Sequence, residues 1–266
     1  METPRISASS YSNTAPLVWS FLYGSNRGSV ELIMDNAPAR SAELLAQDRV
    51  DAALVPIISY QLLDNVRLVP DVCVGAKKRV QSVCLVTKGE DLADVKSVAL
   101  DVSSRTSVVL TKVIFREFIG TKPVWQDASP NIEAMLAGSD AALIIGDPAL
   151  ALSEPGATAT GLRTFDLAEL WYKQTGLGFV FAMWMTRRST VSVDLAAARD
   201  EGIQNLGRIA RNYAENIGID EAAMKEYLSE SISYSVDNSM RQGMELYFSL
   251  AEKHGLIEKV RPLEFI

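Results

Sequence analysis

Apolar and polar positions in the first half of the chain follow a short ordered pattern. An apolar run at residues 6–9 leads into a turn rich in hydroxyl and amide groups, S-Y-S-N-T from Ser10. An apolar segment with helical spacing begins near Pro16, and a strand with the sequence D-A-A-L-V begins at Asp51. This pattern predicts a strand that delivers a polar turn to the N-terminus of a helix.

The second half of the chain repeats this order. A short apolar strand at 98–100 precedes the polar turn D-V-S-S-R-T-S from Asp101, a helix is predicted over 108–119, and the strand D-A-A-L-I-I begins at Asp140. Helix N-termini bind anions because their free amides and positive dipole end point at the ligand. Two such ends facing each other across a cleft suit a small molecule with two carboxylates.

Strands alternate with helices along the chain, which predicts a mixed sheet in each of two lobes. The pattern breaks into charges at 88–94, where we expect a crossover to the second lobe, and the apolar strand from Gly178 predicts the return. A chain with two such crossovers has the anatomy of a hinged binding protein. The predicted lobes are residues 1–88 plus 180–266, and residues 89–179.

Composition narrows the possible partners. The 266 residues are 48% apolar and 22% charged, with a formal net charge of −7, which is typical of a globular protein and argues against a nucleic-acid partner. The N-terminal residues lack the apolar stretch of a secretory signal, and no apolar run reaches the ~20 residues that span a bilayer. We therefore expect a soluble cytoplasmic protein with no membrane partner.

The first polar turn holds more hydrogen-bonding side chains than a helix cap requires. Ser, Thr and Asn are all favoured as N-caps, so capping would account for one of them. Here Ser10 is followed by Ser12, Asn13 and Thr14, ahead of a proline at position 16 that suits the first helical turn. The excess favours ligand contact by Ser12, Asn13 and Thr14.

The second polar turn adds a cation to a similar set of hydroxyls. Ser103 or Ser104 can cap the helix, Thr106 can donate from its first turn, and Arg105 can fork onto a carboxylate. The helix dipole disfavours an arginine at this position. Either an anionic ligand or Asp101 would compensate it, and the sequence leaves both open.

Three further candidates lie in or next to strands. Gly146 ends the second D-A-A-L strand, where a backbone can approach a ligand closely. Asp147 precedes a proline, which fits a helix cap as well as a catalytic carboxylate. Ser82 interrupts an apolar strand, where a serine is more commonly bonded internally than functional. These alternatives stay open at the level of sequence.

Missing residue types limit the chemistry. The single histidine, His254, precedes Gly255 at a predicted helix end and fits a surface capping role. The sequence has no credible Ser–His or Cys–His pair, no His/Cys metal set and no glycine-rich phosphate or dinucleotide loop. We expect chemistry based on hydroxyls, amides and at most one carboxylate, without a metal or a cofactor.

Six motifs span nearly the whole chain. They are S-Y-S-N-T-A-P-L at Ser10, D-A-A-L-V-P at Asp51, R-V-Q-S-V-C-L-V at Arg79, D-V-S-S-R-T-S-V at Asp101, D-A-A-L-I-I-G-D-P-A-L at Asp140 and T-G-L-G-F-V-F-A-M-W at Thr175. In this order the chain resembles the MqnA family, the chorismate dehydratases of the futalosine route to menaquinone.

The resemblance implies a two-lobed, periplasmic-binding-protein-like (type II) α/β fold with its ligand in the interlobe cleft. It implies Asn13 and Ser82 as the catalytic pair, with the S-S-R-T-S turn and Gly146 at the carboxylate site. The implied hydro-lyase reaction converts chorismate, a dicarboxylate, to 3-(1-carboxyvinyloxy)benzoate and water. The proton acceptor would be Asp147 or the substrate's own enolpyruvyl carboxylate, and the latter is favoured.

Three positions depart from the resemblance: the family usually has leucine at Ser12, glutamate at Ser59 and proline at Gly178. Loss of a carboxylate at position 59 would alter substrate preference or the proton path if that position faces the cleft. Two alternative functions are a non-catalytic carboxylate-binding or sensory protein of the same fold, and a sister enzyme acting on a cyclic futalosine-type intermediate.

Overall fold

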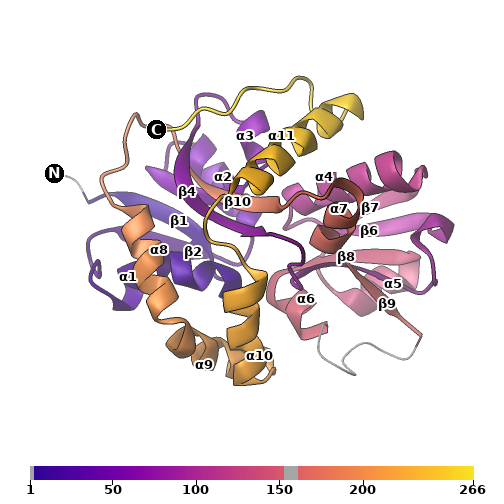
Figure 1. Cartoon of the computed structure of the whole chain (residues 1–266), viewed down its shortest axis with the longest axis horizontal. Coiled ribbons are helices and arrows are strands. Elements are labelled where there is room, and N and C mark those ends of the chain that lie inside the picture. Colours follow the sequence, from indigo (N-terminus) through magenta and orange to yellow (C-terminus); the bar gives the residue numbers. More distant parts are fainter. Residues whose placement is uncertain (1–2, 153–160) are drawn as a thin grey trace.

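The molecule divides into two α/β lobes that lie side by side (Figure 1). The computed structural model describes residues 3–152 and 161–266. Each lobe is built on one five-stranded sheet against which helices pack. The predicted two-lobed α/β architecture is confirmed.

The sheet of lobe one has the strand order β2-β1-β3-β10-β4. Its strands are β1 (Arg5–Ser9), β2 (Glu31–Asp35), β3 (Ala52–Pro56), β4 (Arg67–Ala76) and β10 (Phe179–Thr186). Strand β1 runs parallel to β2 and β3, whereas β10 runs antiparallel to β3 and β4.

The sheet of lobe two repeats this plan in the order β7-β6-β8-β5-β9. Its strands are β5 (Val83–Thr87), β6 (Ser97–Asp101), β7 (Val124–Ala128), β8 (Ala141–Ile145) and β9 (Arg163–Asp166). In each sheet the fourth strand is antiparallel to its neighbours and enters directly from the other lobe: β5 follows β4, and β10 follows the last helix of lobe two. The repeated order of elements in the sequence therefore corresponds to two similar sheets.

The first crossover lies earlier than the predicted boundary at residue 88. Strand β5 pairs with β8 and β9, so the chain has already entered lobe two at Val83. All five residues of β5 are buried in that lobe, and the charged stretch 88–94 is the connection from β5 to β6. The boundary was predicted too late because a short apolar strand suits either sheet. The charged stretch is a turn within lobe two and not the crossover. The return crossover lies between Thr175 and Phe179, next to the predicted boundary at 180.

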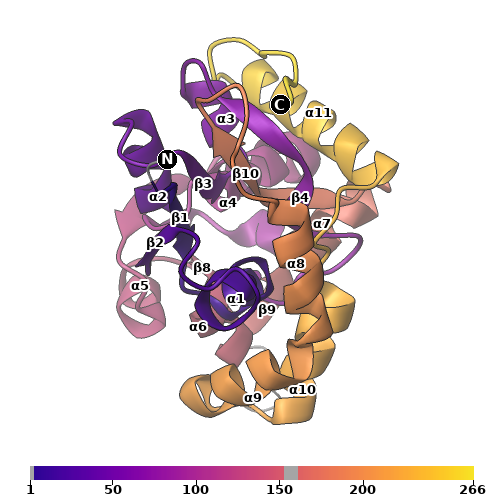
Figure 2. The ribbon, with the colours of Figure 1, turned by 90° about the vertical axis from the view of Figure 1, so that its left-hand side faces the viewer.

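Helices pack against both sheets, and further helices follow the return to lobe one. Before the return they are η1 (Ser12–Thr14), α1 (Ala15–Tyr23), α2 (Pro38–Ala46), α3 (Ser59–Leu62), η2 (Leu92–Asp94), α4 (Thr106–Val113), η3 (Ile114–Ile119), α5 (Ile132–Gly138), α6 (Gly146–Leu152) and α7 (Leu167–Thr175). After it they are α8 (Leu195–Gln204), α9 (Leu206–Ile217), α10 (Glu221–Glu226), η4 (Tyr227–Ser231) and α11 (Asn238–Lys253). Figure 2 shows α8, α9 and α10 following one another past α1.

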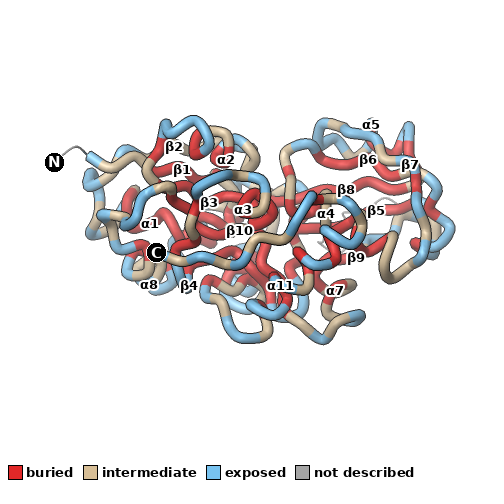
Figure 3. The backbone as a smooth tube through the Cα atoms, turned by 90° about the horizontal axis from the view of Figure 1, so that it is seen from above, coloured by how far each residue is buried: buried red, intermediate tan, exposed pale blue. Residues whose placement is uncertain are grey.

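Segments after the return hold the lobes together. Helix α9 packs against η1 of lobe one and α6 of lobe two, and α11 packs against both β10 and α4. Where the chain returns, the Phe179 ring lies 5.4 Å from the Trp171 ring and 5.1 Å from the Tyr247 ring, centroid to centroid. Figure 3 shows the buried backbone concentrated in the strands of both sheets. Within the described residues, no helix is long and apolar enough to cross a membrane.

Candidate functional site

A pocket lies between the lobes where both polar turns meet. It encloses about 510 Å³ of space outside the protein atoms, part of it open to solvent. The described residues that line it are Ser9, Tyr11, Asn13, Thr14, Pro38, Leu54, Pro56, Val74, Val83, Ser104, Thr106, Ser107, Ile145, Gly146, Phe181 and Ala182. Hydroxyl and amide groups, set among apolar side chains, make up the polar part of this lining.

The first polar turn places Asn13 and Thr14 in the pocket. No side chain caps η1 or α1, so the turn does not use its hydroxyls in the way that helix capping predicts. Instead the Thr14 hydroxyl lies 2.9 Å from that of Ser9 and 3.3 Å from Asn13 Oδ1. The contact with Thr14 orients the Asn13 carboxamide, whose nitrogen is left available for other partners.

Ser12 and Asp147 meet across the lobe boundary and do not line the pocket. The Ser12 backbone N–H and hydroxyl donate to Asp147 Oδ1 at 3.0 and 2.5 Å. Burial raises the pKa of the Asp147 carboxyl, and the two hydrogen bonds from Ser12 oppose that rise. These bonds connect the first turn to the start of α6. Ser12 and Asp147 were predicted to bind substrate, but neither is among the residues that line the pocket.

The second polar turn is organised by its own residues. Asp101 Oδ1 accepts hydrogen bonds from the Ser103 backbone N–H at 2.9 Å and its hydroxyl at 2.6 Å, so Ser103 does not line the pocket. Ser104 Oγ accepts from the Ser107 N–H at 3.2 Å, as a helix cap does, and this bond does not use its hydroxyl proton. Ser104 lines the pocket, so it is both a cap and a potential donor to a ligand.

The side chains of Thr106 and Arg105 bond to residues of lobe one. The Thr106 hydroxyl lies in the pocket lining and donates to the carbonyl of Phe181 at 3.1 Å. Arg105 lies 3.6 Å from Glu43 on α2 and does not line the pocket. Glu43 rather than Asp101 therefore pairs with this arginine, and its contact with a ligand carboxylate stays a prediction.

Gly146 lines the pocket at a position that excludes a side chain. Its φ is +67°, and a Cβ there would lie 2.7 Å from the ring of Tyr11. Its N–H donates to the Ser82 carbonyl at 2.8 Å. Tyr11 was not predicted as a site residue, although it lies within the first polar turn, because an aromatic side chain there is equally expected in a core. Burial raises the pKa of the Tyr11 hydroxyl, which therefore stays neutral.

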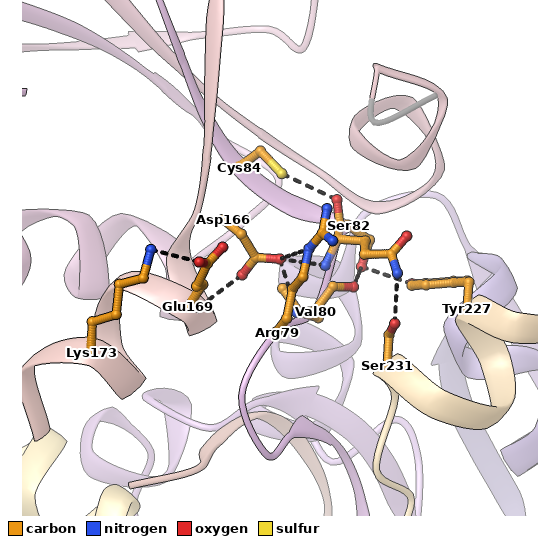
Figure 4. A network of polar contacts seen from close by, with 10 residues as sticks. Arg79, Val80, Ser82, Cys84, Asp166, Glu169, Lys173, Tyr227 and Ser231 are labelled. Atoms are coloured by element: carbon orange, nitrogen blue, oxygen red, sulfur yellow. Dashed lines mark hydrogen bonds and ion pairs between the residues drawn. The ribbon is translucent and has the colours of Figure 1, made fainter. Parts of the chain in front are cut away.

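Ser82 is fully buried and is not part of the pocket lining, although Val83 beside it is. Its Oγ accepts a hydrogen bond from the Tyr227 hydroxyl at 2.7 Å (Figure 4). Asp166 Oδ2 fixes the turn before it by accepting from the backbone N–H groups of Val80 at 2.9 Å and Gln81 at 2.6 Å. Gln81 has a φ of +63°, a costly conformation for a residue with a side chain.

Neither His254 nor Ser59 is among the residues that line the pocket. His254 Nε2 lies 2.7 Å from Glu117 on η3, so it joins α11 to lobe two rather than only capping its own helix. Ser59 is fully buried in α3 and its hydroxyl has no hydrogen-bond partner among the described residues. Ser59 is not among the residues that line the pocket, and an effect of position 59 on substrate preference stays a prediction. Within residues 3–152 and 161–266, no group of three or more His, Cys, Asp or Glu side chains is placed to hold a metal ion.

Two similar α/β lobes enclose a largely apolar pocket that also carries hydroxyl and amide groups. Solved structures share the fold: a protein of Archaeoglobus fulgidus matches with a TM-score of 0.71 at 17% identity, covering 96% of this chain and 98% of its own. The periplasmic aliphatic sulphonate binding protein SsuA of Escherichia coli matches with a TM-score of 0.65 at 16% identity, covering 100% and 94%. These likenesses confirm the periplasmic-binding-protein-like fold.

Sequence comparison is more specific. The family model described as menaquinone biosynthesis matches residues 4–253, and the chain belongs to this family. It is 31% identical to the chorismate dehydratase of Thermus thermophilus over 264 residues, which is 92% of this chain and 93% of that protein. It is 27% identical to the chorismate dehydratase of Campylobacter jejuni over 214 residues, 79% of each.

Proposed function

We propose that this protein is a chorismate dehydratase, a hydro-lyase of menaquinone biosynthesis that forms 3-(1-carboxyvinyloxy)benzoate and water. The observation that carries the proposal is a neutral, hydroxyl- and amide-lined interlobe pocket in a chain that matches a chorismate dehydratase over nearly its whole length. The substrate is a soluble dicarboxylate, the reaction requires no cofactor, and we place it in the cytoplasm.

The reaction is driven by formation of an aromatic ring. The C3 hydrogen of chorismate is vinylogously acidic to the ring carboxylate, so its removal gives a dianionic enolate. Loss of the C4 hydroxyl group, which leaves with one proton as water, then completes the aromatic ring. The protein therefore needs to hold the reacting conformer and stabilise the charge that develops, rather than supply a strong base.

We assign Asn13 and Ser82 as the active-site pair, and the start of α4 with Gly146 as the site for a carboxylate. Asn13 and Ser104 contribute pocket-facing amide and hydroxyl groups, which suit an oxyanion. The enolpyruvyl carboxylate of the substrate accepts the C3 proton. Asp147 is the weaker candidate for this step because both its oxygens accept hydrogen bonds from Ser12 and it does not line the pocket.

Incubation of the purified protein with chorismate tests this proposal. We expect chorismate to disappear with the appearance of equimolar 3-(1-carboxyvinyloxy)benzoate, detected by its benzoate-type absorbance and by mass spectrometry. Deuterium at C3 should be lost from the product. Protein that binds chorismate and returns it unchanged would contradict the proposal.

A non-catalytic carboxylate-binding or sensory protein is the second candidate, favoured by the likeness of the fold to a sulphonate-binding protein. Calorimetry with chorismate in the same preparation separates the two functions. A binding protein would give stoichiometric heat with no product, whereas the enzyme would release product in many-fold excess over protein.

A further inference from the structure

Tyr227 is a polar residue between the proposed active-site pair that sequence reasoning did not identify. It begins η4, a π-helical turn that continues α10, and it is 1% exposed. Its hydroxyl donates to Ser82 Oγ at 2.7 Å, and the Asn13 side chain lies close enough to lower the pKa of the phenol. The phenol thus lies between a pocket-lining amide and a serine buried behind the pocket.

The directions of these hydrogen bonds form a consistent chain. The Thr14 hydroxyl donates to Asn13 Oδ1, so the amide nitrogen of Asn13 is the group directed at Tyr227. The phenol donates its only proton to Ser82 Oγ, which leaves its oxygen free to accept from that nitrogen. Ser82 therefore keeps its own hydroxyl proton, and its Oγ lies 3.5 Å from the Val80 carbonyl.

Several independent contacts hold Tyr227 in place. The end of the same π-helical turn is fixed because Gln81 Nε2 donates to Ser231 Oγ at 2.7 Å (Figure 4). Strand β4 also pairs with the segment after the turn through Gly75 and Ser233. These contacts anchor the phenol against the crossover that carries Ser82, so its position does not depend on the ligand.

Proton donation by Tyr227 is not a plausible role. Burial raises the pKa of its hydroxyl far above the ordinary value of 10.0, and its interactions with Ser82 and Asn13 offset only part of that rise. A phenolate in this environment would be strongly disfavoured. The hydroxyl is thus suited to fix the orientation of its neighbours rather than to transfer a proton.

We propose that Tyr227 is a positioning residue that sets the orientation of Asn13 in the pocket and couples it to Ser82. This inference rests on the proposed dehydration, in which Asn13 contacts the substrate. Without the phenol, the Asn13 amide loses a partner that limits its rotation and Ser82 Oγ loses its donor. The groups that stabilise the developing charge would then be present but poorly aimed, which lowers kcat more than it raises KM.

The substitution Tyr227→Phe tests the proposal because it removes the hydroxyl and keeps the ring. We expect kcat for chorismate to fall by about 10- to 100-fold with KM changed less than about threefold. The double variant Ser82→Ala/Tyr227→Phe should be no slower than the slower single variant, since both act through one network. An unchanged kcat in Tyr227→Phe, or fold-losses that multiply in the double variant, would overturn the proposal.

Tyr234→Phe is the matched control. Tyr234 is also buried, at 5% exposure, its hydroxyl has no hydrogen-bond partner among the described residues, and it does not line the pocket. Its kcat should equal that of the wild type. An equal loss of kcat in both phenylalanine variants would show a general packing effect and contradict the proposal.

A second readout does not depend on turnover. The side-chain amide signal of Asn13 in a ¹⁵N-correlation spectrum, assigned by its absence from Asn13→Ala, should shift and exchange faster in Tyr227→Phe but not in Tyr234→Phe. If the wild type leaves chorismate unchanged, the proposed function fails while this spectrum still tests the role of Tyr227. An unperturbed Asn13 signal in Tyr227→Phe would refute the positioning role.

Discussion

The two polar turns look alike in sequence but are held in different ways. In the turn 101–107, Asp101 binds Ser103 and Ser104 Oγ accepts from the Ser107 N–H, so its first residues are bonded locally. The hydroxyl of Thr106 and the guanidinium of Arg105 bond to lobe one. In the turn 10–14, no side chain caps the helix that follows. Two of its residues are bound instead by distant partners: Asp147 accepts from Ser12, and the Tyr213 hydroxyl donates to the Ser10 carbonyl.

This difference indicates a division of labour between the lobes. The first part of the second turn is ordered by its own residues next to the N-terminus of α4, which suits a carboxylate anchor. The first turn reaches its pocket geometry only when lobe two and the C-terminal helices are in contact with it. Asn13, which lies in the first turn, is therefore the site residue whose position depends most on the rest of the fold.

The largest expected effect follows from removing that residue. Asn13→Ala should lower kcat by on the order of 10²–10³, the loss typical when a preorganised donor to an oxyanion is removed. Steady-state kinetics with chorismate measures the loss, and circular dichroism checks that the fold is retained. His254→Ala is the control, because His254 lies outside the pocket against Glu117, and its kcat should stay within about twofold of the wild type. A near-normal rate for Asn13→Ala would remove the first turn from the chemistry.

Local signals predicted much of this arrangement. The strand–turn–helix order at both turns and the bond from Ser107 to Ser104 depend on neighbouring residues, and each is visible in the sequence. The bond of Ser12 to Asp147 joins residues 135 positions apart, and that of Tyr227 to Ser82 joins residues 145 positions apart. No local periodicity encodes such pairs, so the sequence did not reveal Tyr227.

The lobe boundary was missed for a related reason. Strand β5 is short and apolar and pairs equally well with either sheet, so its sheet membership depends on which partner strands lie beside it. The same limit applies to Arg105, whose partner Glu43 comes from the opposite lobe. The sequence identified groups that form hydrogen bonds and ion pairs, but not which of them bind each other.

The second-largest effect tests the close approach of the first turn to lobe two. Gly146→Ala places a methyl group 2.7 Å from the Tyr11 ring at a φ of +67°. We expect a loss of about 1–2 kcal/mol in unfolding free energy from the left-handed backbone, and a fall in kcat of about 10-fold or more because the displaced ring reshapes the pocket. Chemical denaturation and steady-state kinetics measure the two effects.

Gly176→Ala is the matched control for this change. Gly176 has a φ of +69°, and no atom lies within 4 Å of an added Cβ. It should lose a similar unfolding free energy and keep its kcat. Equal kinetic losses in the two variants would show that the effect of Gly146→Ala comes from backbone strain alone and not from contact between the lobes.

A smaller effect is expected in the turn 101–107. Ser104→Ala removes the cap of α4 and should lower the unfolding free energy by about 1 kcal/mol, with a loss in kcat/KM of about 10-fold from the missing pocket hydroxyl. Denaturation in urea and steady-state kinetics give the two numbers. Ser129→Ala, at an exposed position before α5, is the control and should change neither. If Ser104→Ala left both quantities at wild-type values, the second turn would need another source of order.

The smallest kinetic effect is expected at Asp147, where the two turns are joined. If the enolpyruvyl carboxylate of the substrate takes the C3 proton, Asp147→Asn should retain most of kcat, since an amide oxygen still accepts from Ser12.

Burial raises the pKa of Asp147 above its ordinary 3.8, so the folded state binds this proton more tightly than the unfolded state does. The wild-type unfolding free energy therefore falls as pH rises from near 3.8 through the raised pKa, and Asp147→Asn lacks this fall. Urea denaturation across that range should show the variant gaining stability relative to the wild type.

An analogue of chorismate with its enolpyruvyl carboxylate amidated should bind and not react. A folded, chorismate-binding Asp147→Asn without turnover would instead assign the base to Asp147 and make the junction of the turns part of the chemistry.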